Sequence, residues 1–204
     1  MNDMGKKKLL EYIAGYVQLT GEEEELLLSH AMERNYLKGQ YIVQQGDVCD
    51  KESFVLNGCT RTFYLDGEGN EHVVMFAIEN WWVADMGSFT SKTPATYNVQ
   101  CLDHTEVIQF TYDAMEFLYR KIPKLERFFR LIIQKAFIAS EKRIVSNFSL
   151  TAKERYSNFL EKYPKIEQKV PQYMVASYLG ITKEFLSKIR SEMRNTQVEN
   201  VNLV

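Results

Sequence analysis

The central part of the chain consists of short apolar or β-prone runs that alternate with turn residues. Between about residues 34 and 110, glycine-containing turns such as Asn57-Gly58 separate these runs. Many short strands at regular spacing are typical of an antiparallel sandwich, barrel or roll. The clearest hairpin signal is segment 66–70 (DGEGN), whose glycines can supply the positive φ that tight turns require. We expect strands at 40–44, 53–56, 60–65, 72–78, 96–102 and 105–111.

Helical periodicity dominates the two ends of the chain. We expect one helix at about 9–19 and a second at 21–33, whose acidic first turn suits the positive end of the helix dipole. From Asp113 onward the pattern is helical again, and the stretch 124–148 after Pro123 contains neither Gly nor Pro. This stretch predicts one long helix.

The apolar stripe of that long helix is wider than a single packing face requires. We therefore expect the helix to pack against its own domain and also against a partner subunit. A core helix buried within one protomer is the alternative. The residues predicted for the dimer interface are Leu125, Phe128, Phe129, Ile132, Ala136 and Ala139.

The C-terminal part carries the pattern of a helix-turn-helix. Thr151 and Glu154 have the spacing of a capping box, which opens a helix ahead of this pattern. In segment 172–191 (QYMVASYLGITKEFLSKIRS), Gly180 stands where the chain leaves the first helix in a left-handed conformation, and Thr182 is a good N-cap for the second. A helical hairpin with a solvated charged face is the alternative interpretation.

The second helix of this motif has the side chains needed to bind DNA. Leu186 and Ile189 point it back onto the first helix, so its opposite face can enter the major groove. Lysine can donate to guanine and glutamate can accept from cytosine, whereas hydroxyl and arginine side chains suit phosphates. We expect Phe185 to pack near the helix start rather than to touch a thymine methyl group. The predicted DNA-binding residues are Thr182, Lys183, Glu184, Ser187, Lys188 and Arg190.

Charge divides the chain into two unlike parts. Residues 1–119 contain 8 Lys and Arg against 19 Asp and Glu, whereas residues 120–204 contain 17 against 8. The net charge of −2 therefore conceals an acidic front and a basic back. Only the basic part suits a polyanion such as DNA.

The remaining composition is that of a soluble globular protein, with 45% hydrophobic and 25% charged residues. Three lysines before Leu9 superficially resemble a secretory leader, but Glu11 breaks the apolar run. We therefore expect no membrane segment and a cytoplasmic location. Cys49, Cys59 and Cys101 are odd in number and widely spaced, which excludes a disulfide framework or a four-thiolate metal site and favours buried free thiols.

Several local markers accompany these elements, namely Lys38-Gly39-Gln40, Gln45-Gly46-Asp47, Gly58 and the segment 172–191. Over nearly its full length the chain resembles the Crp–Fnr family of bacterial transcription regulators. The resemblance implies an α+β fold, with a cyclic-nucleotide-binding-type antiparallel β-roll at 1–112, a dimerisation helix at 113–148 and a winged-helix-type helix-turn-helix domain at 149–204. It also implies a homodimer that binds palindromic double-stranded DNA. Only NTQVENVNLV follows Arg194, so we expect a short or missing wing, formed by one short strand or a frayed tail.

The same resemblance points to a ligand site, where this chain departs from the family pattern. Cyclic-nucleotide-binding members carry a Gly-Glu pair for the ribose and an arginine, followed by Ser or Thr, for the cyclic phosphate. The corresponding positions here are Ala84, next to Asp85, and Ala95. Without the arginine a buried phosphate lacks its main charge-assisted partner, so we expect no cyclic AMP binding. A small-molecule effector that remains unidentified would lie near Ala84, Asp85, Met86, Thr96 and Tyr97.

Other sensor and enzyme chemistries lack the residues that they require. Three scattered cysteines cannot hold the iron–sulfur cluster of the oxygen-sensing branch, and the three histidines are too isolated to nominate a haem ligand. A cupin-type metal enzyme requires two close histidines and a carboxylate, and no such set exists. We therefore expect no catalytic residues, no metal site and no certain cofactor. The alternative function is a ligand-binding or protein-interaction module without DNA binding.

Overall fold

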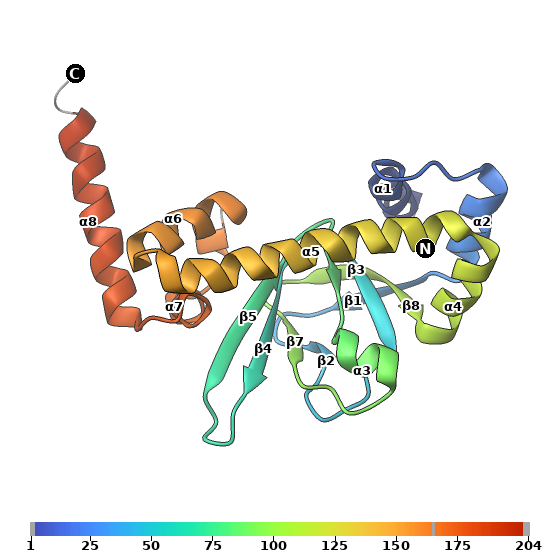
Figure 1. Cartoon of the computed structure of the whole chain (residues 1–204), viewed down its shortest axis with the longest axis horizontal. Coiled ribbons are helices and arrows are strands. Elements are labelled where there is room, and N and C mark those ends of the chain that lie inside the picture. Colours follow the sequence, from blue (N-terminus) through green and yellow to red (C-terminus); the bar gives the residue numbers. More distant parts are fainter. Residues whose placement is uncertain (1–2, 165, 202–204) are drawn as a thin grey trace.

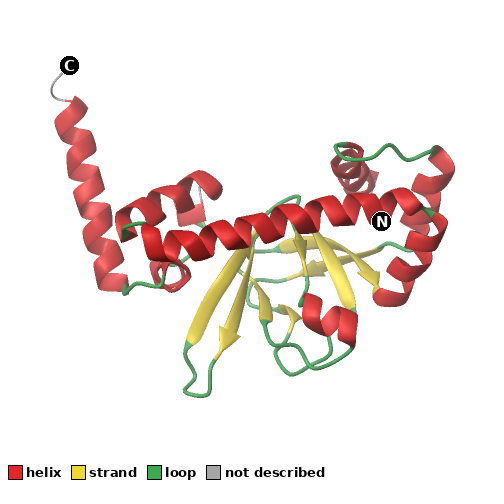
Figure 2. Cartoon of the chain, viewed as in Figure 1, coloured by secondary structure: helices red, strands yellow, loops and turns green. Residues whose placement is uncertain are grey.

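The computed structural model describes residues 3–164 and 166–201, and its centre is a pair of antiparallel four-stranded sheets (Figures 1 and 2). The first sheet contains, in spatial order, β1 (Met32–Tyr36), β8 (Thr105–Thr111), β3 (Lys51–Asn57) and β6 (Trp82–Val83). The second contains β2 (Tyr41–Val43), β7 (Asn98–Cys101), β4 (Thr60–Leu65) and β5 (Glu71–Ala77). The predicted antiparallel roll is confirmed, with β1 and β6 as two strands that the sequence pattern does not reveal.

Turn chemistry sets the connections of the roll. In the β4–β5 hairpin, Asp66 Oδ1 accepts hydrogen bonds from the backbone N–H groups of Glu68 at 3.0 Å and Asn70 at 2.9 Å. Between β3 and β4, Gly58 has a φ of 103°, and a Cβ atom there would lie 2.6 Å from the carbonyl oxygen of His104. Only glycine fits this position, because the backbone passes so close to the start of β8.

Four shorter helices surround the roll. Two precede it, α1 (Asp3–Ala14) and α2 (Gly21–Ser29); two more are α3 (Met86–Ser91) and α4 (Tyr112–Lys121). The first helix thus begins and ends earlier than predicted, and it stops just before Gly15. The second is also shorter than the predicted 21–33, because the chain pairs with β8 as strand β1 from Met32 onward. This long-range pairing overrides the local helical pattern.

The long helix α5 (Pro123–Ser149) is confirmed and runs along most of the molecule (Figure 1). Near its start, Leu125, Phe128 and Phe129 are only 0%, 0% and 5% exposed. They pack into the core of their own protomer, where the rings of Phe129 and Trp82 lie 4.9 Å apart. The prediction that these three residues form the dimer interface is therefore wrong, because side chains that fill one protomer's core cannot reach a second copy.

Three helices and a short 3-10 helix form the C-terminal part. They are α6 (Ala152–Lys162), the 3-10 helix Ile166–Gln168, α7 (Gln172–Leu179) and α8 (Lys183–Val201). The capping box at the start of α6 is present, with Thr151 Oγ1 accepting from Glu154 N at 3.3 Å and Glu154 Oε2 accepting from Thr151 N at 2.8 Å. The expectation of a short strand or frayed tail after Arg194 is wrong up to Val201, because α8 continues to that residue; residues 202–204 lie outside the described part.

The buried side chains form two clusters. One fills the roll beneath α1, α4 and the first half of α5. The other is shared between the roll and the helix-turn-helix unit, defined here as residues 152–201. The roll contributes Cys59, Phe63, Val73, Phe76 and Leu102 to this shared core, which the side chains of α6, α7 and α8 complete. The sensor-like roll and the helix-turn-helix unit are therefore packed together as one body.

The three cysteines are free and buried, as predicted. Desolvation raises the pKa of the Cys59 thiol to about 12 and that of Cys101 to about 11. Such thiols are weak nucleophiles, since the thiolate is the reactive form. Within residues 3–164 and 166–201, none of the helices is long and apolar enough to cross a membrane.

Candidate DNA-binding surface and ligand segment

The turn of the helix-turn-helix has the geometry that its sequence predicts. Gly180 ends α7 in the left-handed region at a φ of 66°. The backbone N–H of Ile181 donates to the carbonyl oxygen of Ala176 at 3.1 Å, which closes the end of α7. Thr182 Oγ1 accepts from the N–H of Phe185 at 3.2 Å, so Thr182 satisfies one of the donors left free at the start of α8.

The buried face of α8 decides which of its side chains are available to DNA. Leu186 and Ile189 are buried in the shared core together with Val175 and Leu179 of α7. With these two side chains inside, the opposite face of α8 is directed to solvent. Figure 1 shows α8 at one end of the molecule, projecting away from the roll. This end is where a DNA groove has access to the helix.

The predicted DNA-binding residues lie on this exposed face, with one exception. The exposed ones are Thr182, Lys183, Glu184, Ser187 and Lys188. Arg190 is half-buried and interacts within the protein, so it lies at the margin of the face.

The face extends further than the sequence analysis proposes. Ser191 and Asn195 follow Ser187 at intervals of four residues, and both are exposed. Helical periodicity carried past Arg190 would have identified them. Phe185 is 47% exposed, so the expectation that it packs against the protein is wrong. At the start of α8 it is Leu186, and not Phe185, that packs against α7.

The predicted effector residues surround an internal hydrogen-bond network centred on Asp85. Asp85 is 4% exposed, and its Oδ1 accepts from the N–H of Ser88 at 3.0 Å, which caps α3. Its Oδ2 accepts from the N–H groups of Thr96 at 2.7 Å and Tyr97 at 3.0 Å. The Asp85 carboxylate therefore accepts from three backbone donors of this segment, which gives it a structural role that requires no effector.

The other residues of this segment do not fit a cyclic nucleotide. Ala84 and Tyr97 are half-buried, Met86 and Thr96 are exposed, and Ala95 is buried where the family places its arginine. No guanidinium replaces that arginine here, and the buried Asp85 carboxylate would repel an incoming phosphate. Burying the two anions side by side would cost free energy, and Lys92, the one cation of segment 84–97, is instead directed to Asp113 and the ring of Tyr112.

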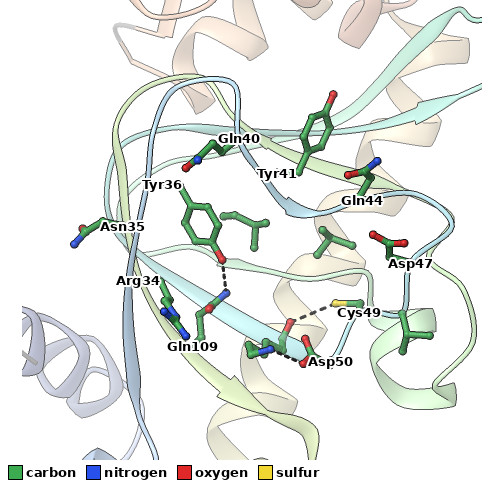
Figure 3. A pocket seen from close by; sticks show the side chains of 14 residues that line it. Arg34, Asn35, Tyr36, Gln40, Tyr41, Gln44, Asp47, Cys49, Asp50 and Gln109 are labelled. Carbon is green, nitrogen blue, oxygen red and sulfur yellow. Dashed lines mark hydrogen bonds and ion pairs between the residues drawn. The ribbon is translucent and has the colours of Figure 1, made fainter.

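A separate polar hollow of about 740 Å³ lies beside the edges of β1 and β2 (Figure 3). Gln109 is buried at its base, and its Nε2 donates to Tyr36 Oη at 3.2 Å and to Ser53 Oγ at 2.9 Å. Two basic residues, Arg34 and Lys51, and two acidic residues of the 44–51 loop balance the charge of the lining. The hollow overlaps none of the predicted effector residues. Its side chains come from three separate segments, so no local sequence motif could identify it.

Replacing Asp85 should destabilise the protein, because its carboxylate holds the segment from α3 to Tyr97 together. Asp85→Ala leaves three backbone N–H groups without their acceptor, the one of Ser88 buried, and we expect a loss of about 2–4 kcal/mol in the free energy of unfolding, measured by urea denaturation. Asp85→Asn retains one side-chain oxygen and should lose less. Wild-type protein should show no calorimetric heat with cyclic AMP. Equal stability of wild type and Asp85→Ala would contradict the role given to this carboxylate.

Comparisons with known proteins agree with this architecture. Residues 33–121 match the model of the cyclic nucleotide-binding domain family. The transcriptional activator protein Anr of Pseudomonas protegens is 22% identical over 172 residues, which cover 79% of this chain and 70% of that protein.

Solved structures share the fold of nearly the whole chain. The c-di-GMP responsive global regulator CLP of Xanthomonas campestris has a TM-score of 0.71 at 14% identity, covering 87% of this chain and 93% of that chain. FixK2 of Bradyrhizobium japonicum has a TM-score of 0.71 at 16% identity, covering 82% of this chain and 86% of that chain. Residues 33–121 therefore match a cyclic nucleotide-binding domain, and the chain as a whole resembles transcription regulators of the Crp–Fnr type in sequence and in fold.

Proposed function

We propose that this protein is a sequence-specific transcription regulator that binds palindromic DNA as a homodimer in the cytoplasm. The observation that carries this proposal is the position of α8, with Leu186 and Ile189 buried and Lys183 and Lys188 exposed on its outer side. A helix presented in this way can enter a major groove and place its first turns against base edges. The family relatives that are transcription regulators support the same function.

The exposed side chains of α8 suggest distinct roles. Lys183 and Lys188 can donate to guanine O6 and N7, and Glu184 can accept from cytosine N4. Thr182 and Ser187 suit phosphate oxygens at the edge of the groove. Arg190, at the margin of the face, is positioned for a phosphate rather than for a base, because it is half-buried and already engaged within the protein.

A second exposed feature, on α5, supports dimerisation. Ile133, Phe137, Ser140, Ile144 and Phe148 follow one another at intervals of three or four residues along the second half of the helix. The four apolar members are 50–87% exposed, which leaves an apolar stripe uncovered in a single protomer. Intervals of three and four are those of a coiled-coil seam. We infer that this stripe, together with the exposed Ala136, forms the dimer interface. Ile132 packs against the core of its own protomer instead, and Ala139, fourteen residues after Leu125, lies on the roll-facing side of α5.

The proposed function does not require cyclic AMP. The Asp85 network satisfies the donors of segment 84–97, which supports a regulator that folds and binds DNA without cyclic AMP. An effector of other chemistry would have to bind outside those donors. Neither an iron–sulfur cluster nor a metal forms part of this proposal.

The dimer interface can be tested with a matched pair of substitutions on α5. Phe137 and Val145 are 63% and 61% exposed, but Val145 points about a quarter-turn or more away from the stripe. Phe137→Glu should shift the protein from dimer to monomer in sedimentation equilibrium and weaken binding to a full palindrome, because it buries a charge in the seam. Val145→Glu should leave the dimer intact. An identical response to both substitutions would exclude this stripe as the interface.

DNA binding is tested by selecting bound sites from a random DNA pool and measuring affinities for the selected site. Two inverted half-sites with centres about one helical turn (~34 Å) apart are expected. Lys183→Ala and Lys188→Ala should lose about 1–3 kcal/mol of discrimination at individual base pairs, whereas Arg190→Ala should weaken all sequences alike and reduce the salt dependence. Lys153→Ala, at an exposed position on α6, is the control and should bind as wild type. Absence of DNA binding at low salt would disprove the proposed function.

A further inference from the structure

The helix-turn-helix unit is attached to the roll at the free edge of β5. β5 is the last strand of its sheet and pairs only with β4, so its outer side presents unpaired backbone groups. Ser177 of α7 lies against this edge. Its Oγ accepts from the N–H of Val73 at 3.0 Å and donates to the carbonyl oxygen of Glu71 at 2.8 Å. One hydroxyl group thereby satisfies a donor and an acceptor of the strand edge, as a neighbouring strand would.

Arg143 of α5 also binds both β5 and α7 at this junction. Its guanidinium donates to the carbonyl oxygens of Val73 and Val74 in β5, and to that of Tyr178 in α7 at 3.1 Å. The guanidinium carbon also lies 4.2 Å from the centroid of the Tyr178 ring. Arg143 is thus bound to β5 and α7 at once. A planar fork of donors is suited to this task, and a lysine could not reproduce it.

Arg143 continues the roll-facing side of α5. It follows Leu125 by eighteen residues, which is five turns of an α-helix. The next residue, Ile144, belongs to the exposed stripe proposed as the dimer interface. The position of α7 against β5 is therefore tied to the part of α5 that would face the partner subunit.

Aromatic packing holds the same junction rigid. The ring of Phe76 in β5 lies 6.0, 5.9 and 5.6 Å from the rings of Phe159, Tyr163 and Tyr178. Only Gly180–Thr182 separate α7 from α8. Fixing α7 on β5 therefore also fixes α8 relative to α5.

We propose that Arg143 and Ser177 are positioning residues that set the distance between the two recognition helices of the dimer, and so determine which half-site spacing it accepts. This inference rests on the proposed function. Neither residue lies on the exposed face of α8, so neither contributes to contacts with an individual half-site. Without these two side chains the helix-turn-helix unit should move more freely relative to the roll, while α8 keeps its own helical structure.

The test compares affinity for a single half-site with affinity for palindromes of different spacing. The probes are a duplex with one selected half-site, and palindromes whose half-sites are moved one or two base pairs closer or further apart. The proteins are wild type, Arg143→Ala, Arg143→Lys, Ser177→Ala, Ser177→Thr and the exposed neighbour control Lys142→Ala. Circular dichroism and sedimentation confirm that each variant is folded and dimeric.

Arg143→Ala and Ser177→Ala should bind the single half-site within about twofold of wild type, but lose about tenfold of discrimination between the best and the altered spacings, equivalent to about 1.4 kcal/mol. Ser177→Thr retains the hydroxyl group and should recover most of the discrimination, while Arg143→Lys should not. Lys142→Ala should match wild type.

Two outcomes would overturn the inference while leaving the proposed function intact. One is an unchanged spacing profile in both alanine variants. The other is an equal loss of affinity on half-site and palindrome, which is the result that general damage to the fold would produce. Wild-type protein that selects no DNA sequence would instead remove the proposed function, and this inference with it.

Discussion

The edge of β5 is the constraint on which the arrangement of this protein depends. An exposed strand edge carries unpaired hydrogen-bonding groups, which proteins must cover or leave to solvent. Here the helix-turn-helix unit covers it through the Ser177 hydroxyl group and the rings around Phe76, and α5 adds the Arg143 guanidinium. The polar contacts fix the orientation of α7 on β5, because each has a defined partner on the backbone. The apolar contacts stabilise the junction, because they remove large aromatic rings from water.

This junction changes the expected route from sensor to DNA. A roll joined to a helix-turn-helix unit by one helix alone would transmit a signal only by moving that helix. In this chain the roll also touches α7 directly, so a displacement of the β4–β5 hairpin would act on the helix-turn-helix unit through β5 as well as through α5. Meanwhile the Asp85 carboxylate holds α3 and the 96–97 loop in place from within. Both features favour a protein in which the position of α8 is set by the fold itself, without a bound effector.

Local patterns predict a large part of this structure, and the exceptions share one cause. Strand 60–65, the capping box at Thr151 and the left-handed Gly180 depend on neighbouring residues, and each is found as predicted. Which part of the apolar face of α5 is buried does not depend on neighbouring residues in the sequence. Phe128 and Phe137 are equally apolar, and only the position of the roll decides that the first is buried and the second exposed. Likewise Asp85 and Ser177 have ordinary sequence surroundings, and each has a partner far along the chain, 11 residues away for Thr96 and 106 residues away for Glu71.

The central claim is that the roll and the helix-turn-helix unit are one cooperative body. Differential scanning calorimetry of the full chain tests it most directly. A shared core predicts a single unfolding transition, whose calorimetric and van't Hoff enthalpies agree once dissociation of the dimer is included. Two resolved transitions, one for the roll and one for the helix-turn-helix unit, would contradict the account, because they would show that the contacts at β5 do not couple the two parts.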